Sequence, residues 1–191
     1  GIGGGLAAGG LRLASGSNDN KVRVFDPVAG GEALVVLDAR ADALTAFTDP
    51  ATGEPRLVSG SSDGVRVWNP AASGAAIRAE PEGHSEDVND LVTFVDPATG
   101  ALRVVTAGWE GAPRVWDAET GGGLLVIKEK TSALPALVVF KDPATGAPRL
   151  ACGCSDGKVR VFDAVSGGEA LLVFDVGAVV NALVAFKDLA T

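Results

Sequence analysis

The stretch Arg-Leu-Ala-Ser-Gly-Ser-Asn-Asp-Asn-Lys-Val-Arg-Val-Phe-Asp at 12–26 returns three more times, at 56–69, 103–117 and 149–163. The residues that open the four copies lie 44, 47 and 46 positions apart and are all arginines: Arg12, Arg56, Arg103 and Arg149. Self-similarity at this period is typical of arrays in which one small sheet is copied and stacked. The chain is therefore expected to be a repeat protein of four units.

Each copy contains four short strand signals separated by turn residues. In the third copy these signals fall at 88–95, 102–108, 113–117 and 124–128. The first turn reads Asp-Pro-Ala-Thr-Gly at 96–100, where proline fixes one φ and glycine supplies a left-handed position. The same five residues recur at 49–53 and 142–146. Each unit is therefore predicted to be a four-stranded antiparallel meander.

One such sheet cannot bury both of its faces, so the copies must stack face to face around an axis. We predict an all-β fold, a β-propeller with four blades in this chain. On the third strand of each blade, valines such as Val22 and Val24 alternate with arginine, so one face is buried and the other polar. The expected organisation is a glycine-rich lead-in at 1–10 followed by the propeller at 11–191.

The two ends of the repeat pattern predict how the ring closes. Residues 5–12 align with 96–103, so the chain starts without a first strand, and 179–186 repeat that missing strand. Sixteen strands are expected, with the C-terminal strand completing the first blade. Two alternatives to a closed four-bladed ring stay open: half of an eight-bladed ring completed by a second copy, and a piece of a longer protein, which the absence of Met favours.

Composition narrows the class of protein. Hydrophobic residues make up 47% of the 191 residues and aromatic residues only 5%, so Val, Leu and Ala must build the core. A net charge of -8 disfavours binding to nucleic acid or to an anionic membrane surface. The sequence contains neither an apolar run long enough to cross a bilayer nor a secretion signal. We expect a soluble intracellular protein, in the cytoplasm by default.

Gly83-His84 and Trp116-Asp117 stand near the start and the end of the third copy. With the Ser-Gly-Ser strands and the acidic residue of the turn that follows, they give the chain, from about residue 11 to 186, a pattern that resembles the WD-repeat β-propeller family. The resemblance implies a structural hydrogen-bond network formed by His84, Thr106, Glu110 and Trp116. Copies one and four have Phe in place of Trp, so we expect an intact network in one blade at most.

The residues offer little for catalysis. His84 is the only histidine, and a zinc site needs three or four converging ligands. Cys152 and Cys154 lie two apart on an expected strand, where they are interpreted as small buried residues. The string Gly-Ser-Ser-Asp-Gly at 60–64 matches a nucleophile elbow but lies between two strands. We expect no catalytic residues, no metal and no cofactor.

One face of the propeller is the candidate for recognition. Its connecting loops differ between copies, whereas the opposite face has near-identical turns, and variable exposed loops often bind partners. We predict a scaffold that binds a protein or peptide, with a basic one suggested by the acidic loop, through one set of residues: Trp109, Glu80, Glu82, Glu86, Asp87, Lys128 and Lys130. The alternative is a small-ligand binder or enzyme whose central channel holds an anion with four arginines: Arg23, Arg66, Arg114 and Arg160.

Overall fold

The structure, a computed structural model, describes residues 10–80, 84–128 and 132–187. Within these residues the chain forms fifteen strands in four separate antiparallel sheets. Blade 1 consists of β1 (Leu13–Ser17), β2 (Lys21–Phe25) and β3 (Val35–Asp38), and blade 2 of β4 (Ala43–Thr48), β5 (Pro55–Ser61), β6 (Gly64–Trp68) and β7 (Arg78–Glu80). Blade 3 consists of β8 (Val88–Val95), β9 (Leu102–Gly108), β10 (Arg114–Asp117) and β11 (Gly123–Val126). Blade 4 consists of β12 (Ala136–Lys141), β13 (Pro148–Gly153), β14 (Lys158–Asp163) and β15 (Gly167–Asp175).

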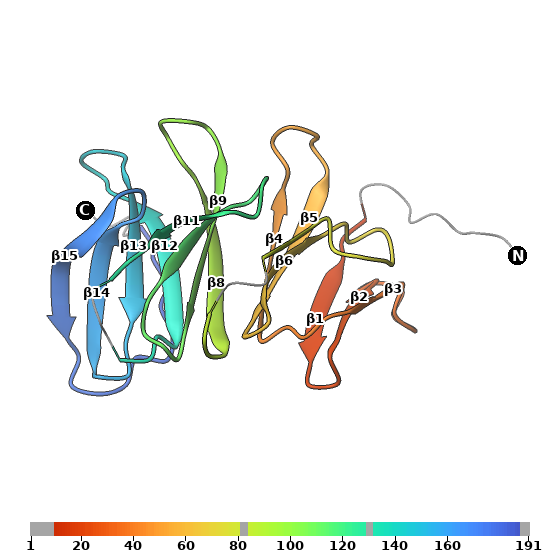
Figure 1. Ribbon diagram of the computed structural model, residues 1–191, viewed down its shortest axis with the longest axis horizontal. Helices are drawn as coiled ribbons and strands as arrows, with labels where there is room; N and C mark the ends of the chain where they lie inside the picture. The colour runs from red at the N-terminus through yellow and green to blue at the C-terminus, as the bar shows by residue number, and fades with distance from the viewer. Residues whose placement is uncertain (1–9, 81–83, 129–131, 188–191) are drawn as a thin grey trace, which may run out of the picture.

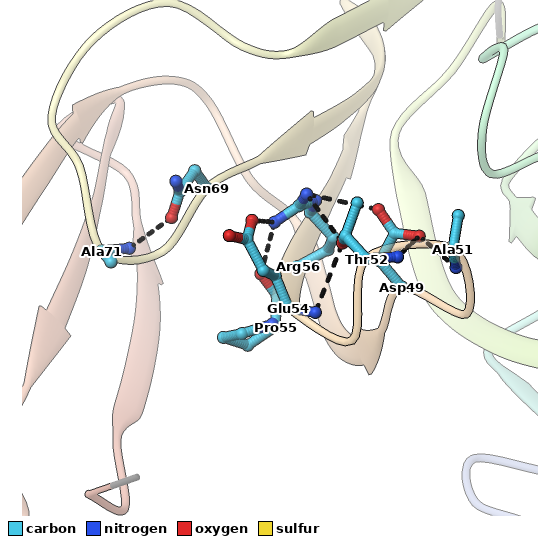
Figure 2. A network of polar contacts seen from close by, with 8 residues as sticks. All are labelled: Asp49, Ala51, Thr52, Glu54, Pro55, Arg56, Asn69 and Ala71. Atoms are coloured by element: carbon cyan, nitrogen blue, oxygen red, sulfur yellow. Dashed lines mark hydrogen bonds and ion pairs between the residues drawn. The ribbon is translucent and has the colours of Figure 1, made fainter. Parts of the chain in front are cut away.

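The turns between the first and second strands of blades 2 to 4 show why the meander forms. In blade 2 the Gly53 N–H bonds to the Asp49 carbonyl at 2.7 Å, and Gly53 has a φ of 71° that favours glycine. The Asp49 carboxylate accepts the Ala51 N–H at 2.9 Å (Figure 2). The same pattern at Asp96 and Asp142 makes these turns equivalent. Five local residues therefore reverse the chain in each of the three blades.

The four blades stand side by side in chain order, with blade 1 and blade 4 at opposite ends of the row (Figure 1). The first strands of neighbouring blades lie next to one another, β4 beside β8 and β8 beside β12. Each sheet packs its face on the next sheet, which is the predicted β-propeller arrangement. The row forms an open arc in this structure, because blade 4 does not reach blade 1.

Three hydrophobic cores lie between successive blades. Each combines valines from one blade with an aromatic residue and a leucine or valine from the next. Between blades 1 and 2, for example, Val22, Val24 and Leu37 pack with Leu57 and Trp68. The buried valines of β2 alternate with the half-exposed Lys21, Arg23 and Phe25, as the period of two predicted. Blade stacking is therefore the main source of apolar burial.

The expected sixteenth strand does not form in this structure. Blade 1 has the three strands that the sequence predicted, but residues 178–187 are in no strand, and β1 has no partner on its inner edge within the described residues. Val180 lies against Gly153 and Cys154 of blade 4, at the other end of the row from β1. Completion of the first blade within one chain is therefore not seen, because the two elements that should pair are separated by the whole arc.

Candidate functional site

The four residues of the expected network converge within blade 3. The Trp116 Nε1–H donates to the Thr106 hydroxyl at 2.8 Å, and His84 contacts Thr106 through Nε2 and Glu110 through Nδ1. The rings of His84 and Trp116 lie 6.3 Å apart at a tilt of 52°. His84, Thr106 and Trp116 are buried, so this chain of bonds satisfies polar groups that water does not reach.

Glu110 accepts from His84 although it is one methylene longer than the aspartate usual in such turns. Burial raises the pKa of this carboxyl, but the contacts with His84 and Arg114 lower it more, so the net pKa lies below its ordinary value. The ionised Glu110 carboxylate accepts the Nδ1–H of His84, and Nε2 on the other side of the ring accepts the hydrogen bond of the Thr106 hydroxyl. The arrangement holds a loop against a blade and leaves no reactive group open.

A second, shorter version of this network exists in blade 2, and the sequence analysis missed it. The Trp68 Nε1–H donates to the Ser59 hydroxyl at 2.9 Å, and both residues are buried. Blades 1 and 4 have Phe25 and Phe162 at the tryptophan position, and phenylalanine has no N–H to donate. The available signal was the similar spacing of a hydroxyl residue and a tryptophan, nine residues from Ser59 to Trp68 and ten from Thr106 to Trp116.

The four arginines of the third strands do not converge on a common site. Arg23 and Arg160 each bond to the aspartate four residues earlier, Asp19 and Asp156, with shortest distances of 2.6 and 2.7 Å. Arg114 Nε lies 3.5 Å from the Glu110 carboxylate, and Arg66 bonds to the carbonyl of Asp63. Each guanidinium is therefore engaged by the turn of its own blade. This arrangement favours the structural interpretation of these arginines over an anion site in a channel.

On the face predicted for recognition, connecting loops touch the turns of the next blade. Arg40, in the loop after β3, bonds to Ser62 at 3.0 Å and to Asp87 at 2.7 Å. The Trp109 N–H bonds to the Asp87 carbonyl at 3.3 Å, which brings the loop before β8 to the turn after β9. Trp109 is 61% exposed on this face.

The other predicted partner-binding residues fall into three groups. Glu86 and Lys128 are exposed and Asp87 is half-buried. Glu80 ends β7, and its side chain is not described. Glu82 and Lys130 lie outside the described residues. The structure thus brings Trp109 together with Asp87, and it leaves the contribution of Glu80, Glu82 and Lys130 as a prediction.

Cys152 and Cys154 form no disulfide and are both buried, as expected for small core residues of β13 and the turn that follows it. Over residues 10–80, 84–128 and 132–187, no group of three or more His, Cys, Asp or Glu side chains is placed to hold a metal ion. The same residues contain no helix with the length and apolar character that crossing a bilayer requires.

A cleft of about 560 Å³ lies on the side of the propeller where the Asp-Pro-Ala-Thr-Gly turns are, between blades 1 and 2. Leu11, Ala14 and Val24 line it from blade 1, and Ala46 and Leu57 line it from blade 2. Figure 2 shows the polar rim on blade 2, where Arg56 bonds to Glu54 and Thr52, and Asn69 caps the next turn. The sequence analysis did not predict this cleft, because the cleft lies beside β1, where blade 1 lacks, within the described residues, the fourth strand that the other blades have.

Comparison with known proteins supports the fold. Neither known protein-family profiles nor curated protein sequences match the chain. Among solved structures, the computationally designed Ika8 protein is similar with 28% identity and a TM-score of 0.68, over 93% of this chain and 50% of that one. The WD40 β-propeller domain of Doa1 is similar with 18% identity and a TM-score of 0.67, over 90% of this chain and 53% of that one. The chain therefore has a β-propeller fold and spans about half the length of these structures.

Proposed function

We propose that this chain is a non-catalytic interaction module that binds a basic peptide or a basic loop of a protein on its loop face. The observation that carries the proposal is the exposed indole of Trp109 beside the acidic residues of the loop before β8. We also infer from the bonded side chains of His84, Thr106 and Trp116 that the module is of the WD-repeat type. The similarity to the Doa1 domain supports the propeller alone.

Trp109 has the properties of a binding anchor. It occupies a turn tip where the other blades have Asn18, Ser62 and Ser155, so the turn itself does not require an aromatic side chain. A large apolar surface that is 61% exposed at such a place costs free energy unless a partner covers it. Tryptophan is also the residue that most often dominates binding energy at protein interfaces.

The charge around Trp109 selects the class of partner. Glu86 is exposed and Asp87, whose carbonyl accepts the Trp109 N–H, is half-buried, within a protein of net charge -8. Asp87 is partly neutralised by Arg40, so Glu86 is the freer source of negative potential. A guanidinium or ammonium group over the indole face would gain a cation–π contact and attraction to these carboxylates. A lysine- or arginine-containing segment fits both features.

The test is a selection of phage-displayed random peptides on the chain, followed by calorimetric titration of the enriched peptides. We expect enrichment of Lys- and Arg-containing sequences. Trp109→Ala should weaken binding of these peptides at least tenfold, and Glu86→Lys should weaken it mainly at low salt. Val28→Ala is the matched control, because Val28 is also exposed but lies in the turn after β2, on the opposite face. Selection of acidic or purely apolar peptides, or equal affinity after Trp109→Ala, would refute the proposal.

A further inference from the structure

The two end blades expose the faces that the inner blades bury. Leu13 of β1 is 56% exposed, whereas the residues at the same position in blades 2, 3 and 4, Leu57, Val104 and Leu150, are 3%, 1% and 0% exposed. In those blades this residue packs against the blade before it. Leu13 therefore lies on the face that a preceding blade would cover.

Blade 4 shows the complementary feature on its other face. Phe174 of β15 is 52% exposed, whereas its counterparts Leu37 in blade 1 and Ile127 in blade 3 are 1% and 0% exposed. These counterparts are buried by the blade that follows. Phe174 therefore lies on the face that a following blade would cover. One end of the arc lacks a preceding blade and the other lacks a following one.

The cleft next to β1 has the position of a missing strand. In blades 2, 3 and 4 the second strand pairs along its inner edge with β4, β8 and β12. Within the described residues β1 has no such partner, and the 560 Å³ cleft opens beside it against Ala46 of β4. The lining is largely apolar, with Leu11, Ala14 and Leu57. An extended apolar segment with a period of two fits both the free edge and the lining.

Residues 178–187 have the sequence and the starting geometry of that segment. Val180 N–H bonds to the Cys154 carbonyl at 3.2 Å, as Leu134 N–H bonds to the Gly108 carbonyl at 3.1 Å where the chain passes from blade 3 to blade 4. Past this point β12 enters a sheet, but 181–187 do not. Phe186 is 83% exposed, whereas Phe94, at the same position of β8, is 8% exposed in the core between blades 3 and 4.

We propose that residues 179–186 of one copy of this chain fill the cleft of a second copy and pair with its β1, and that the exchange is reciprocal. Blade 4 of each copy then packs on blade 1 of the other, and two arcs form one ring of eight blades. The register follows from β4 with β5 and β12 with β13: it pairs Phe186 with Arg12, Ala185 with Leu13, and Leu183 with Ser15. Phe186 then fills the cleft between blades 1 and 2 of the second copy, as Phe94 fills the core between blades 3 and 4.

A second copy is a better occupant than the tail of the same chain. Each blade packs on the next one along the chain, so β1 of blade 1 and Val180, which lies against blade 4, are at opposite ends of the row (Figure 1). The arc matches about half the length of two larger solved structures, with TM-scores of 0.68 and 0.67, which is the size relation expected if a full ring holds about twice as many blades. Head-to-tail contacts of this kind form a ring when the rotation closes and a filament when it does not.

The first experiment measures the mass of the chain in solution by light scattering or native mass spectrometry. We expect about 38 kDa, twice the chain mass of 19.1 kDa. Phe186→Asp should shift the mass to that of one chain, because the charge cannot enter an apolar cleft. Val95→Asp is the matched control, since Val95 is 56% exposed and belongs to blade 3, which lies at neither end of the row, and it should leave the mass unchanged. Circular dichroism of both variants checks that the blades remain folded.

The second experiment tests the register. Leu13→Cys combined with Ala185→Cys places two thiols on directly opposed residues, where the distance between Cα atoms suits a disulfide. Mild oxidation should give a covalent dimer on a non-reducing gel. Leu13→Cys with Ala182→Cys is the control, because the second thiol then lies three residues out of register on the opposite face of the strand, and far less cross-linked dimer should form.

The outcomes separate this proposal from the binding of basic peptides. A monomer of the unmodified chain, a filament, or a covalent link within one chain would overturn the exchange of strands, and none of these would bear on Trp109. A dimer that survives Phe186→Asp would also overturn it, because the association would then use another surface. A dimer lost with Phe186→Asp and linked through Leu13 and Ala185 supports it, whether or not any peptide binds the loop face.

Discussion

Replacing Thr106 by valine is the sharpest test of what holds blade 3 together. Valine has nearly the same shape, so the substitution removes the hydroxyl and leaves no cavity. The Trp116 N–H then loses its acceptor at 2.8 Å and the His84 Nε2 loses its donor, and both groups stay buried. Each unsatisfied buried polar group costs about 1–3 kcal/mol, so the loss of unfolding free energy should be at least about 2 kcal/mol.

The assay is urea unfolding followed by tryptophan fluorescence, with Ser59→Ala in blade 2 for comparison. Ser59 accepts only the Trp68 N–H, so its loss leaves one unsatisfied group and should cost about half as much. Combining Thr106→Val with Trp116→Phe removes the stranded N–H, so the cost of the pair should be smaller than the sum of the two single costs. Additive costs, or a Thr106→Val effect below about 0.5 kcal/mol, would show that the hydrogen-bonded chain does not stabilise the blade.

Two further predictions concern pH and the core. The N–H groups of the turns lower the pKa values of Asp26, Asp49, Asp96 and Asp142, with Ala29, Ala51, Ala98 and Ala144 as the largest contributors. The stabilisation from these four carboxylates is complete above the unfolded pKa of about 4 and is lost as the pH falls through the lower pKa values of the folded state. The urea concentration at the midpoint of unfolding should therefore stay level from pH 7 to 5 and fall below pH 4. A midpoint that rises below pH 4 would contradict the lowered pKa values. Leu37→Ala should lower the unfolding free energy by about 2–5 kcal/mol, because Leu37 is buried between blades 1 and 2. Val36→Ala, on the exposed face of the same strand, should lower it by less than about 1 kcal/mol. Similar losses for the two variants would contradict the assigned faces of β3.

The positions of the strands could be predicted because their signals are local. The expected strands at 88–95 and 102–108 coincide with β8 and β9, and 124–128 is displaced by one or two residues from β11 (Gly123–Val126). A period of two, proline and glycine at the turns, and their repetition act within a few residues of the chain. His84, Thr106 and Trp116 could be named in advance only because they resemble a known pattern, since their contacts join residues 10 to 32 positions apart.

By itself the sequence determined the repeated meander, its turns, its buried valines and the three-stranded start of the first blade, because alternation and turn chemistry select these features locally. Only the tertiary structure decided that Trp109 projects into solvent, that the arginines of the third strands are engaged by their own turns, and that a cleft lies beside β1. These depend on the angle at which one sheet packs on the next. That angle is set by the summed contacts of whole faces, and no single copy of the repeat encodes it.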